Sequence, residues 1–262
     1  MSDGRFIRYA DEGEVVRITL ARPPLNILTI DMIEELARTI EAAGGRPGVK
    51  ALVFAAEGKA FSAGVSVEDH IGERAKLMID AFHGVFRRLH AVDCHTVAAV
   101  QGAALGGGAE LATFCDVVVA TDNATFGQAE IKVGVFPPIA AVHYPKRVGL
   151  SRTLRLLLSG EVITAGEALR IGLVDRVVAP DALAAAVGEE LARVTSQSAV
   201  VLRYTKRAVK AALGVDLTKR PEVEGAVEQV VAQLGQLDVV VNNAGWDKME
   251  MFLDTAEETW DK

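Results

Sequence analysis

The sequence predicts an α/β fold, and three observations support this prediction. Short runs rich in β-branched residues recur between residues 15 and 178, as strands do. Segments with apolar residues at helical spacing lie between them, and such alternation of strand and helix is typical of a sheet covered by helices. Of the 262 residues, 50% are hydrophobic and 24% are charged, so the chain can bury a large core.

The elements follow from local patterns in chain order. The run VVRITL at residues 15–20 alternates apolar and polar side chains, as a half-buried strand does, and Pro23 stops it because proline has no N–H for a ladder. Apolar residues then repeat at helical spacing up to Ile40, with Thr29 and Asp31 as candidate caps. Next come a buried strand at residues 50–55, a loop at 57–64 and an amphipathic helix at 77–89.

The second half of this region continues the alternation. Apolar runs at residues 96–100 and 116–120 predict two buried strands, and between them a glycine run opens into a helix that starts near Ala109. The remaining expected elements are helices at residues 151–158, 165–171, 183–194 and 200–213 and a short strand at 174–178.

Composition excludes several classes of protein. The formal net charge is −7 and the pI is about 5.3, with no basic stripe of the kind that nucleic-acid binding needs. No apolar run is long enough to span a bilayer, and the polar, acidic N-terminus is unlike a signal or transit peptide. Two cysteines, Cys94 and Cys115, and five histidines without metal-ligand spacing argue against a disulfide framework and a metal site. We therefore expect a cytoplasmic protein with no metal and no membrane or nucleic-acid partner.

The segment 100–116, VQGAALGGGAELATFCD, is the most informative one. Three consecutive glycines stand at a helix start, where the backbone can approach a ligand and the first N–H groups have no partner within the helix. The helix dipole favours negative charge there, so the turn suits a phosphate or an oxyanion; a tight turn packed on a neighbour is the alternative. The spacing of Gly102, Gly106 and Gly108 also occurs in some dinucleotide-binding loops, but the carboxylate that follows would repel a pyrophosphate.

A second loop, residues 58–68 (GKAFSAGVSVE), follows the strand expected at 50–55 and again exposes backbone through small residues. Two such loops, each after a parallel strand, would direct two N–H donors at one carbonyl oxygen. Donors already in place stabilise an enolate that forms at this oxygen, each by about 3–4 kcal/mol of barrier in comparable sites. The two loops together therefore predict an oxyanion hole.

Two glutamates follow these loops in the sequence. Glu110 lies on the helix after the glycines among apolar neighbours, and Glu130 follows a Gly-Gln turn in the segment 125–138. Carboxylates that share an apolar pocket can divide the chemistry, one protonated as an acid and one ionised as a base towards water. A solvated surface charge is the alternative for either residue, and the apolar neighbours of Glu110 argue against it there.

Three linked motifs resemble the enoyl-CoA hydratase/isomerase (crotonase) family: AFSAGVSVE, then ALGGGAELATFCD followed by FGQAEIKVG, then the region 157–178. The likeness covers about residues 6–213. It implies the crotonase fold, an α/β spiral of β-β-α units with perpendicular sheets, and assembly as trimers or dimers of trimers. It also implies an acyl-CoA substrate, with no cofactor beyond the CoA that the substrate carries.

The functional positions of this family map onto matching positions of the chain. The resemblance implies that the N–H groups of Val65 and Gly107 form the oxyanion hole and that Glu110 and Glu130 are the two hydratase glutamates. Isomerases of the family usually keep only one of this pair, so the presence of both favours hydration. The residues implied to contact the substrate are Ala63, Val65, Ser66, Val67, Glu68 and Gly107.

Departures from the family pattern concern the acyl site. Ser66 replaces an aspartate, Ala129 replaces a proline, and Pro138 stands where hydratases often have a glycine whose N–H helps to hold the water. With Phe136 nearby, the pocket floor is expected to be bulkier, and the variant looks most like the alicyclic dienoyl-CoA hydratases of aromatic-compound degradation. A general enoyl-CoA hydratase/isomerase of fatty-acid oxidation is the main alternative. A catalytically dead CoA-binding protein is disfavoured because both glutamates remain.

The pattern changes near residue 214, and we expect a crotonase-like core at 1–214 and a tail at 215–262. The tail resembles a fragment of a short-chain dehydrogenase/reductase, with a helix at 222–234 and the strand motif LDVVVNNAG. The glycine-rich loop and the Tyr/Lys pair of that family are missing from it. An NAD-dependent dehydrogenase is therefore disfavoured, and we expect the tail to bind no NAD.

Overall fold

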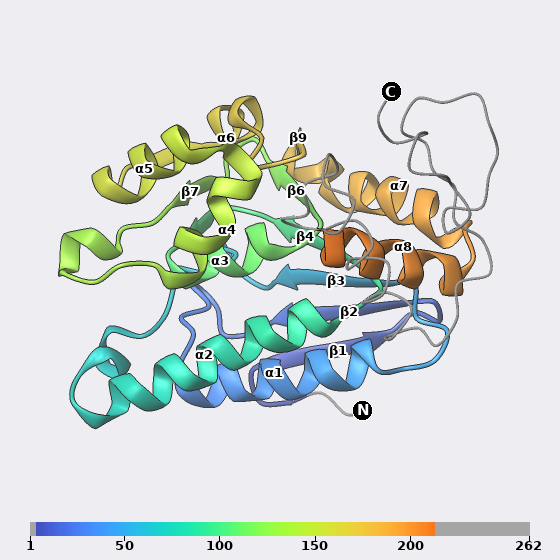
Figure 1. The fold of residues 1–262 in the computed structure, drawn as a ribbon, viewed down its shortest axis with the longest axis horizontal. Helices are drawn as coiled ribbons and strands as arrows, with labels where there is room; N and C mark the ends of the chain where they lie inside the picture. The colour runs from blue at the N-terminus through green and yellow to red at the C-terminus, as the bar shows by residue number, and fades with distance from the viewer. Residues whose placement is uncertain (1–3, 213–262) are drawn as a thin grey trace, which may run out of the picture. The chain divides into compact units, whose positions relative to one another are not determined.

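The computed structural model describes residues 4–212, in which two β-sheets are covered by helices (Figure 1). The chain divides into two compact units after Leu202, and both sheets lie in the first unit. The α/β class predicted from the sequence is confirmed. The expected boundary at 214, the tail 215–262 and its dehydrogenase-like helix and strand lie outside the described residues.

The larger sheet has six strands in the order β1-β2-β3-β4-β6-β9. β1 and β2 are antiparallel, and every other pair of neighbours is parallel, with Val16 opposite Leu52 and Ala98 opposite Val118. The strands are β1 (Ile7–Asp11), β2 (Val15–Leu20), β3 (Ala51–Ala56), β4 (His95–Val100), β6 (Val117–Thr121) and β9 (Arg176–Val178). All five strands predicted between residues 15 and 178 are present, and β1 is an addition.

The smaller sheet consists of β5 (Ala103–Leu105), β7 (Thr125–Gly127) and β8 (Val162–Thr164). β5 and β7 are parallel, whereas β7 and β8 are antiparallel. None of these strands was predicted, because three residues are too few to display a period of two. β5 places the glycine run after a strand of this second sheet instead of directly after β4.

The helices agree with the predicted ones except at α4. They are α1 (Ile30–Gly44), α2 (Glu73–Ala91), α3 (Gly107–Phe114), α4 (Pro138–Val148), α5 (Leu150–Ser159), α6 (Ala165–Ile171), α7 (Leu183–Thr195) and α8 (Ala199–Ala212), with 3-10 turns η1 (Val67–His70), η2 (Glu130–Val133) and η3 (Pro180–Ala182). Pro145 inside α4 hides the helical pattern, since an interior proline normally ends a helix. Among the described helices, none is both long and apolar enough to cross a membrane.

The start of α1 differs from its expected capping. Thr29 occupies the N-cap position, but its side chain makes no capping hydrogen bond, and Asp31 lies inside the first turn. Instead the carboxylate of Asp69, buried at the end of η1, accepts a hydrogen bond of 3.1 Å from the Ile30 N–H. A residue distant in the sequence thus supplies the cap and links α1 to the loop that precedes α2.

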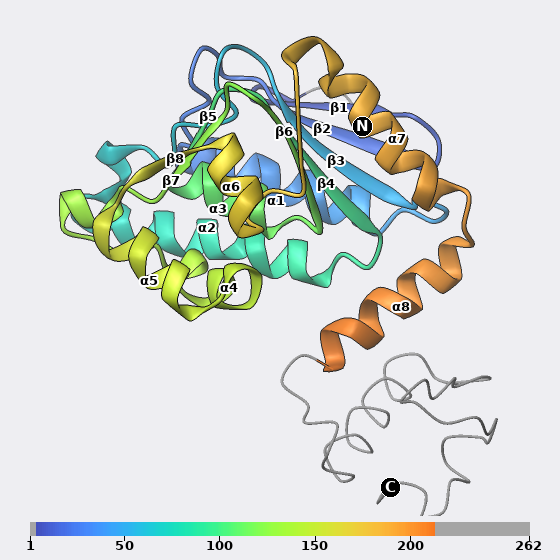
Figure 2. The ribbon, with the colours of Figure 1, turned by 90° about the horizontal axis from the view of Figure 1, so that it is seen from above.

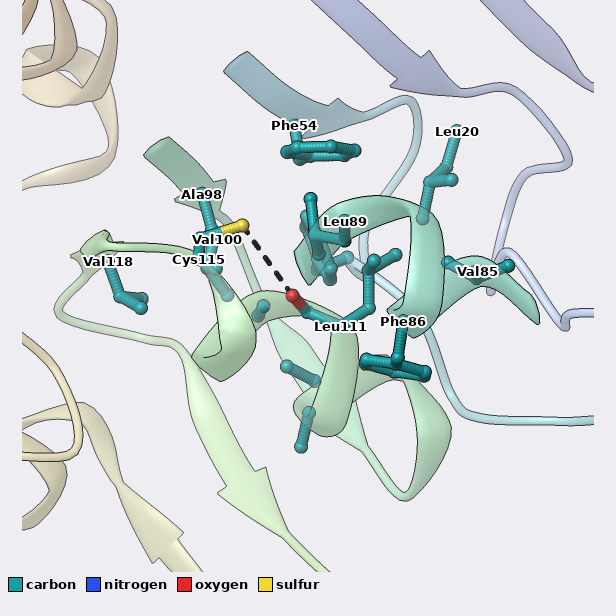
Figure 3. Packing of buried hydrophobic residues seen from close by; sticks show 14 of the residues in the cluster. Leu20, Phe54, Val85, Phe86, Leu89, Ala98, Val100, Leu111, Cys115 and Val118 are labelled. Atoms are coloured by element: carbon teal, nitrogen blue, oxygen red, sulfur yellow. Dashed lines mark hydrogen bonds between the residues drawn. The ribbon is translucent and has the colours of Figure 1, made fainter. Parts of the chain in front are cut away.

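The core lies on both faces of the larger sheet because alternate strand residues point to opposite sides. Val53 and Val97 pack with Leu191 of α7 on one face, whereas Phe54 and Ala98 belong to the larger cluster on the other. Figure 2 shows α7 on one side of β3 and β4, with α1 and α2 on the other. In Figure 3 the buried side chains of α2 and α3 meet those of the strands.

Cys94 and Cys115 are both buried thiols, as predicted for core residues. The Cys115 thiol donates to the Leu111 carbonyl at 3.6 Å at the end of α3 (Figure 3). Burial of a large apolar side chain contributes roughly 1.5–3 kcal/mol. The layers around α3 therefore hold this short helix, which carries part of the candidate site, firmly against the sheet.

Candidate active site

The two predicted loops pair with each other through their backbones. Ser62 forms a parallel bridge with Ala104 of β5: its N–H donates to the Ala103 carbonyl at 3.1 Å, and its carbonyl accepts from the Leu105 N–H at 2.9 Å. The segment that follows β3 therefore acts as an additional short strand beside β5. This pairing brings the loop 62–65 to the start of α3.

Glycines are required where the two loops meet. Gly64 has φ +102°, and a Cβ there would lie 3.0 Å from the Leu105 carbonyl oxygen and 3.8 Å from the Gly107 nitrogen. At Gly108 a Cβ would lie only 2.5 Å from the carbonyl oxygen of Ser62. Since real side-chain atoms do not approach backbone oxygen that closely, any larger residue at Gly108 would force the loops apart.

Two N–H groups at this junction remain available as donors. α3 begins at Gly107, two residues before the predicted start, so the Gly107 N–H belongs to the first turn and has no partner within the helix. The backbone bridge of Val65 to Leu28 uses the carbonyl of Gly64 and the N–H of Ser66, which leaves the Val65 N–H outside it. Neither N–H donates to another group among residues 4–212. The oxyanion hole assigned to Val65 and Gly107 stays a prediction.

Asn26 organises the loop that follows β3, and sequence reasoning missed this residue. This buried residue has a left-handed φ of 49°, and its amide NH2 donates to the carbonyls of Glu57 (2.8 Å) and Ala60 (2.9 Å). The Ser62 hydroxyl in turn donates to the Asn26 carbonyl at 2.8 Å. Asparagine tolerates the left-handed region better than most residues. An asparagine shortly after two prolines was therefore the sequence signal for a tight turn at this position.

Glu110 is enclosed by protein. It lies in the first turn of α3, two residues after the glycines, and only 2% of its surface is exposed. One carboxyl oxygen accepts a 2.8 Å hydrogen bond from the Ala140 N–H in the first turn of α4. Burial raises the pKa of Glu110 from 4.5 to about 8, opposed by the hydrogen bonds from α4 and reinforced by the charge of Glu130. The expectation that its apolar neighbours bury Glu110 is confirmed.

Glu130 lies across the glycine turn from this residue. It begins η2 and is half-buried, and a Cβ on Gly106 would lie 2.6 Å from one of its carboxyl oxygens. Its carboxylate therefore packs directly against the turn that starts α3. Burial raises the pKa of Glu130, whereas the charge of His70 lowers it.

The two glutamates lie near the junction of the two loops, where the two N–H groups are. The environments of the two glutamates differ. The deeper burial of Glu110 favours its protonated form, and the half-exposed Glu130 ionises more readily. A pair with one protonated and one ionised carboxyl can donate a proton on one side and accept one on the other. Such a site is suited to adding or removing water next to a carbonyl group.

The remaining predicted residues lie along η1 and its approach. Ala63 and Ser66 are half-buried, whereas Val67 and Glu68 are exposed. Pro138 is the first residue of α4, a position that needs no N–H, and the Ala140 N–H is the one that reaches Glu110. Phe136 is 72% exposed in the single chain, and its contribution to the pocket floor stays a prediction.

Solved structures place this arrangement in a known fold. The chain superposes on the crystal structure of an enoyl-CoA hydratase from Mycobacterium smegmatis with a TM-score of 0.80, covering 88% of this chain and 91% of that one at 26% identity. The fold and the paired loops therefore define an α/β protein with the crotonase fold, as the resemblance implied.

Sequence relatives narrow the class further. The chain matches the sequence profile of the enoyl-CoA hydratase/isomerase family over residues 10–261. It is 32% identical to a cyclohexa-1,5-dienecarbonyl-CoA hydratase of Thauera aromatica, covering 95% of this chain and 94% of the relative. It is also 32% identical to a crotonyl-CoA hydratase of Syntrophomonas wolfei, covering 81% of this chain and 84% of that relative. The chain belongs to the enoyl-CoA hydratase/isomerase family and is an enzyme of the enoyl-CoA hydratase type.

Proposed function

We propose that this enzyme adds water across a double bond of an unsaturated acyl-CoA thioester. The observation that carries the proposal is the buried Glu110 and the half-buried Glu130 beside two N–H groups without partners among the described residues. The N–H groups of Val65 and Gly107 would donate hydrogen bonds to the thioester oxygen and stabilise the enolate that develops on it. No cofactor or metal is needed for this chemistry, since CoA is part of the substrate.

The proton balance follows from the two environments. The ionised carboxyl, Glu130 in the free enzyme, takes a proton from water while the water oxygen bonds to a carbon of the double bond. The protonated carboxyl, Glu110, supplies the proton that the enolate carbon receives. One water is consumed, its hydroxyl and one proton enter the product, and the proton taken up by Glu130 must return to Glu110 before the next turnover.

The substrate that we propose is a cyclic dienoyl-CoA of aromatic-compound degradation. Support comes from the Thauera aromatica relative, whose match extends over 95% of the chain, and from Pro138, which removes a donor near the glutamates. Identity alone does not separate the candidates, because the crotonyl-CoA hydratase of Syntrophomonas wolfei is equally identical at 32%. A linear enoyl-CoA of fatty-acid oxidation is therefore the alternative substrate.

A direct comparison of substrates tests this proposal. The full chain is incubated separately with cyclohexa-1,5-dienecarbonyl-CoA and with crotonyl-CoA, and the products are identified by mass and NMR. We expect a hydroxycyclohexene carbonyl-CoA from the first substrate and a much lower kcat/KM for the second. A kcat/KM for crotonyl-CoA equal to or above that of the cyclic substrate rejects the cyclic assignment, and no hydration of either rejects the hydratase function.

We also propose that the chain forms a homo-oligomer, a trimer or a dimer of trimers, in the cytoplasm. Large apolar side chains on consecutive elements from η2 to α5 are exposed in the single chain: Val133, Phe136, Val142, Leu150, Leu154 and Leu158. Soluble monomers rarely expose so many apolar side chains along one segment, which supports burial of this region between copies. Partner copies could then cover Phe136.

A further inference from the structure

One face of α4 reaches both glutamates. Ala140 and Tyr144 are four residues apart, so they lie one above the other on the same side of the helix, and both are buried. The Ala140 N–H donates to Glu110 at 2.8 Å. One turn later the Tyr144 hydroxyl lies 2.9 Å from the side-chain amide of Gln128. α4 thus contacts Glu110 directly and Glu130 through one intermediate side chain.

Gln128 connects Tyr144 to Glu130. The amide is buried between them, and with its NH2 towards Glu130 it donates to both carboxyl oxygens at 3.2 Å while its carbonyl accepts from the Tyr144 hydroxyl at 2.9 Å. The opposite orientation would set the amide oxygen against the carboxylate oxygens, two acceptors with no proton between them. The hydrogen-bonding partners therefore select the orientation in which Gln128 donates to Glu130.

The Tyr144 hydroxyl is suited to fix this orientation. Burial raises the pKa of Tyr144, so the phenol keeps its proton throughout the neutral range and remains available as a donor. Among the charged groups, His70 at the end of η1 lowers the pKa of Glu130, and the charge of Glu130 raises the pKa of Glu110 on α3. Gln128 is uncharged, and it contributes a directed hydrogen bond that those charges do not.

We propose that Tyr144 is a positioning residue, which acts through Gln128 to hold Glu130 ionised and aimed at the junction of the two loops. The proposal rests on the acid–base function of Glu130 but not on the identity of the acyl group. In the sequence, Gln128 and Tyr144 are separated by 16 residues and carry no shared motif. Only the fold reveals that they form one relay with Glu130.

The test follows the titration of Glu130 itself, without turnover. The carboxyl carbons of glutamate are labelled with 13C, Glu130 is assigned with Glu130→Gln, and its pKa is measured by NMR in the wild type, Tyr144→Phe, Gln128→Met and the double variant. We expect Gln128→Met to raise the pKa of Glu130 by about one unit, as loss of a hydrogen bond to a charged group predicts. Tyr144→Phe should also raise the pKa of Glu130, but by less. In the Gln128→Met background, the additional Tyr144→Phe substitution should cause no further shift.

The controls separate this role from damage to the fold. Tyr204→Phe changes an exposed tyrosine and should leave both the pKa of Glu130 and the melting temperature unchanged. An unshifted pKa in Tyr144→Phe with intact melting overturns the proposal, as does a full additional shift in the double variant. Kinetics are run in parallel: if the wild type hydrates no acyl-CoA but the pKa values shift as expected, the proposed function fails while the relay stands.

Discussion

The two walls of the candidate site are built from different parts of the chain. One wall consists of backbone from the loop 62–65 and the turn 105–108, held together by the Ser62–Ala104 bridge and by glycines at the points of contact. The other consists of side chains: Glu110 and Glu130, held from α4 and from Gln128. The first wall depends on the absence of side chains, whereas the second depends on their burial.

This difference decides how each wall can be altered. Backbone N–H groups do not titrate, so the first wall should respond to steric change and not to pH. The carboxyls change charge within the accessible range because burial moves their pKa values upwards. Variants that act on only one wall should therefore separate positioning of the thioester from proton transfer.

The largest effect is expected from removing the charge of the second wall. Glu110→Gln and Glu130→Gln should each lower hydration at least about a hundredfold while retaining binding of the CoA thioester, because an amide keeps the shape but transfers no proton. Steady-state kinetics and calorimetric binding of a non-reacting acyl-CoA measure the two quantities. Glu34→Gln on the exposed face of α1 is the matched control. Near-normal turnover in either site variant would rule out the two-glutamate mechanism.

An intermediate effect is expected from one methyl group on the first wall. Gly108→Ala sets a Cβ 2.5 Å from the Ser62 carbonyl, so the loops must separate. We expect a loss of roughly 1–3 kcal/mol in the free energy of unfolding, as for other overpacked sites, and about a tenfold lower kcat/KM. Denaturant unfolding and kinetics measure the two effects.

The same substitution elsewhere provides the control for this variant. Gly188 lies inside α7, where an added Cβ would meet no atom within 4 Å apart from the adjacent backbone of the helix, and alanine there should stabilise the helix by up to about 1 kcal/mol. If Gly108→Ala is as well tolerated as Gly188→Ala, close approach of the loops is not needed for the site.

The first wall could be predicted from sequence because its requirements are local. A glycine triplet before a helix and a loop of small residues both restrict the backbone within a few positions, and both predicted loops are at the junction. Burial of Glu110 was predictable for the same reason, from its apolar neighbours. The start of α3 was misplaced by two residues only because glycine has a low helix propensity.

The supporting residues could not be predicted, since their partners are distant in the chain. Asn26 holds a carbonyl 34 residues away, and Gln128 and Tyr144 are 16 residues apart. The smaller sheet was missed because its strands are three residues long, and α4 because Pro145 interrupts its pattern. The contacts of Asn26, Gln128 and Tyr144 are tertiary, and no local period or motif encodes them.

The most gradual effect is expected from pH, which acts on the carboxyl wall alone. Glu110 has an ordinary pKa of 4.5 in the unfolded chain and about 8 in the folded protein. Below pH 4.5 both states carry the proton, so the stability linked to this group is fully present. As pH rises towards 8 the unfolded chain releases its proton first, and stability is lost at up to about 1.4 kcal/mol per pH unit.

Glu110→Gln has an amide that does not titrate, so its free energy of unfolding should fall less steeply than that of the wild type between about pH 5 and 8. Gly108→Ala keeps Glu110, so its free energy of unfolding should fall with pH in parallel with that of the wild type, lower by a constant amount. Urea unfolding at a series of pH values measures all three proteins. Parallel curves for Glu110→Gln and the wild type would mean that the folded protein ionises Glu110 as easily as the unfolded chain does. Glu110 would then be ionised at neutral pH and could not act as the proposed acid. The two walls would then differ in their steric requirements but not in their response to pH.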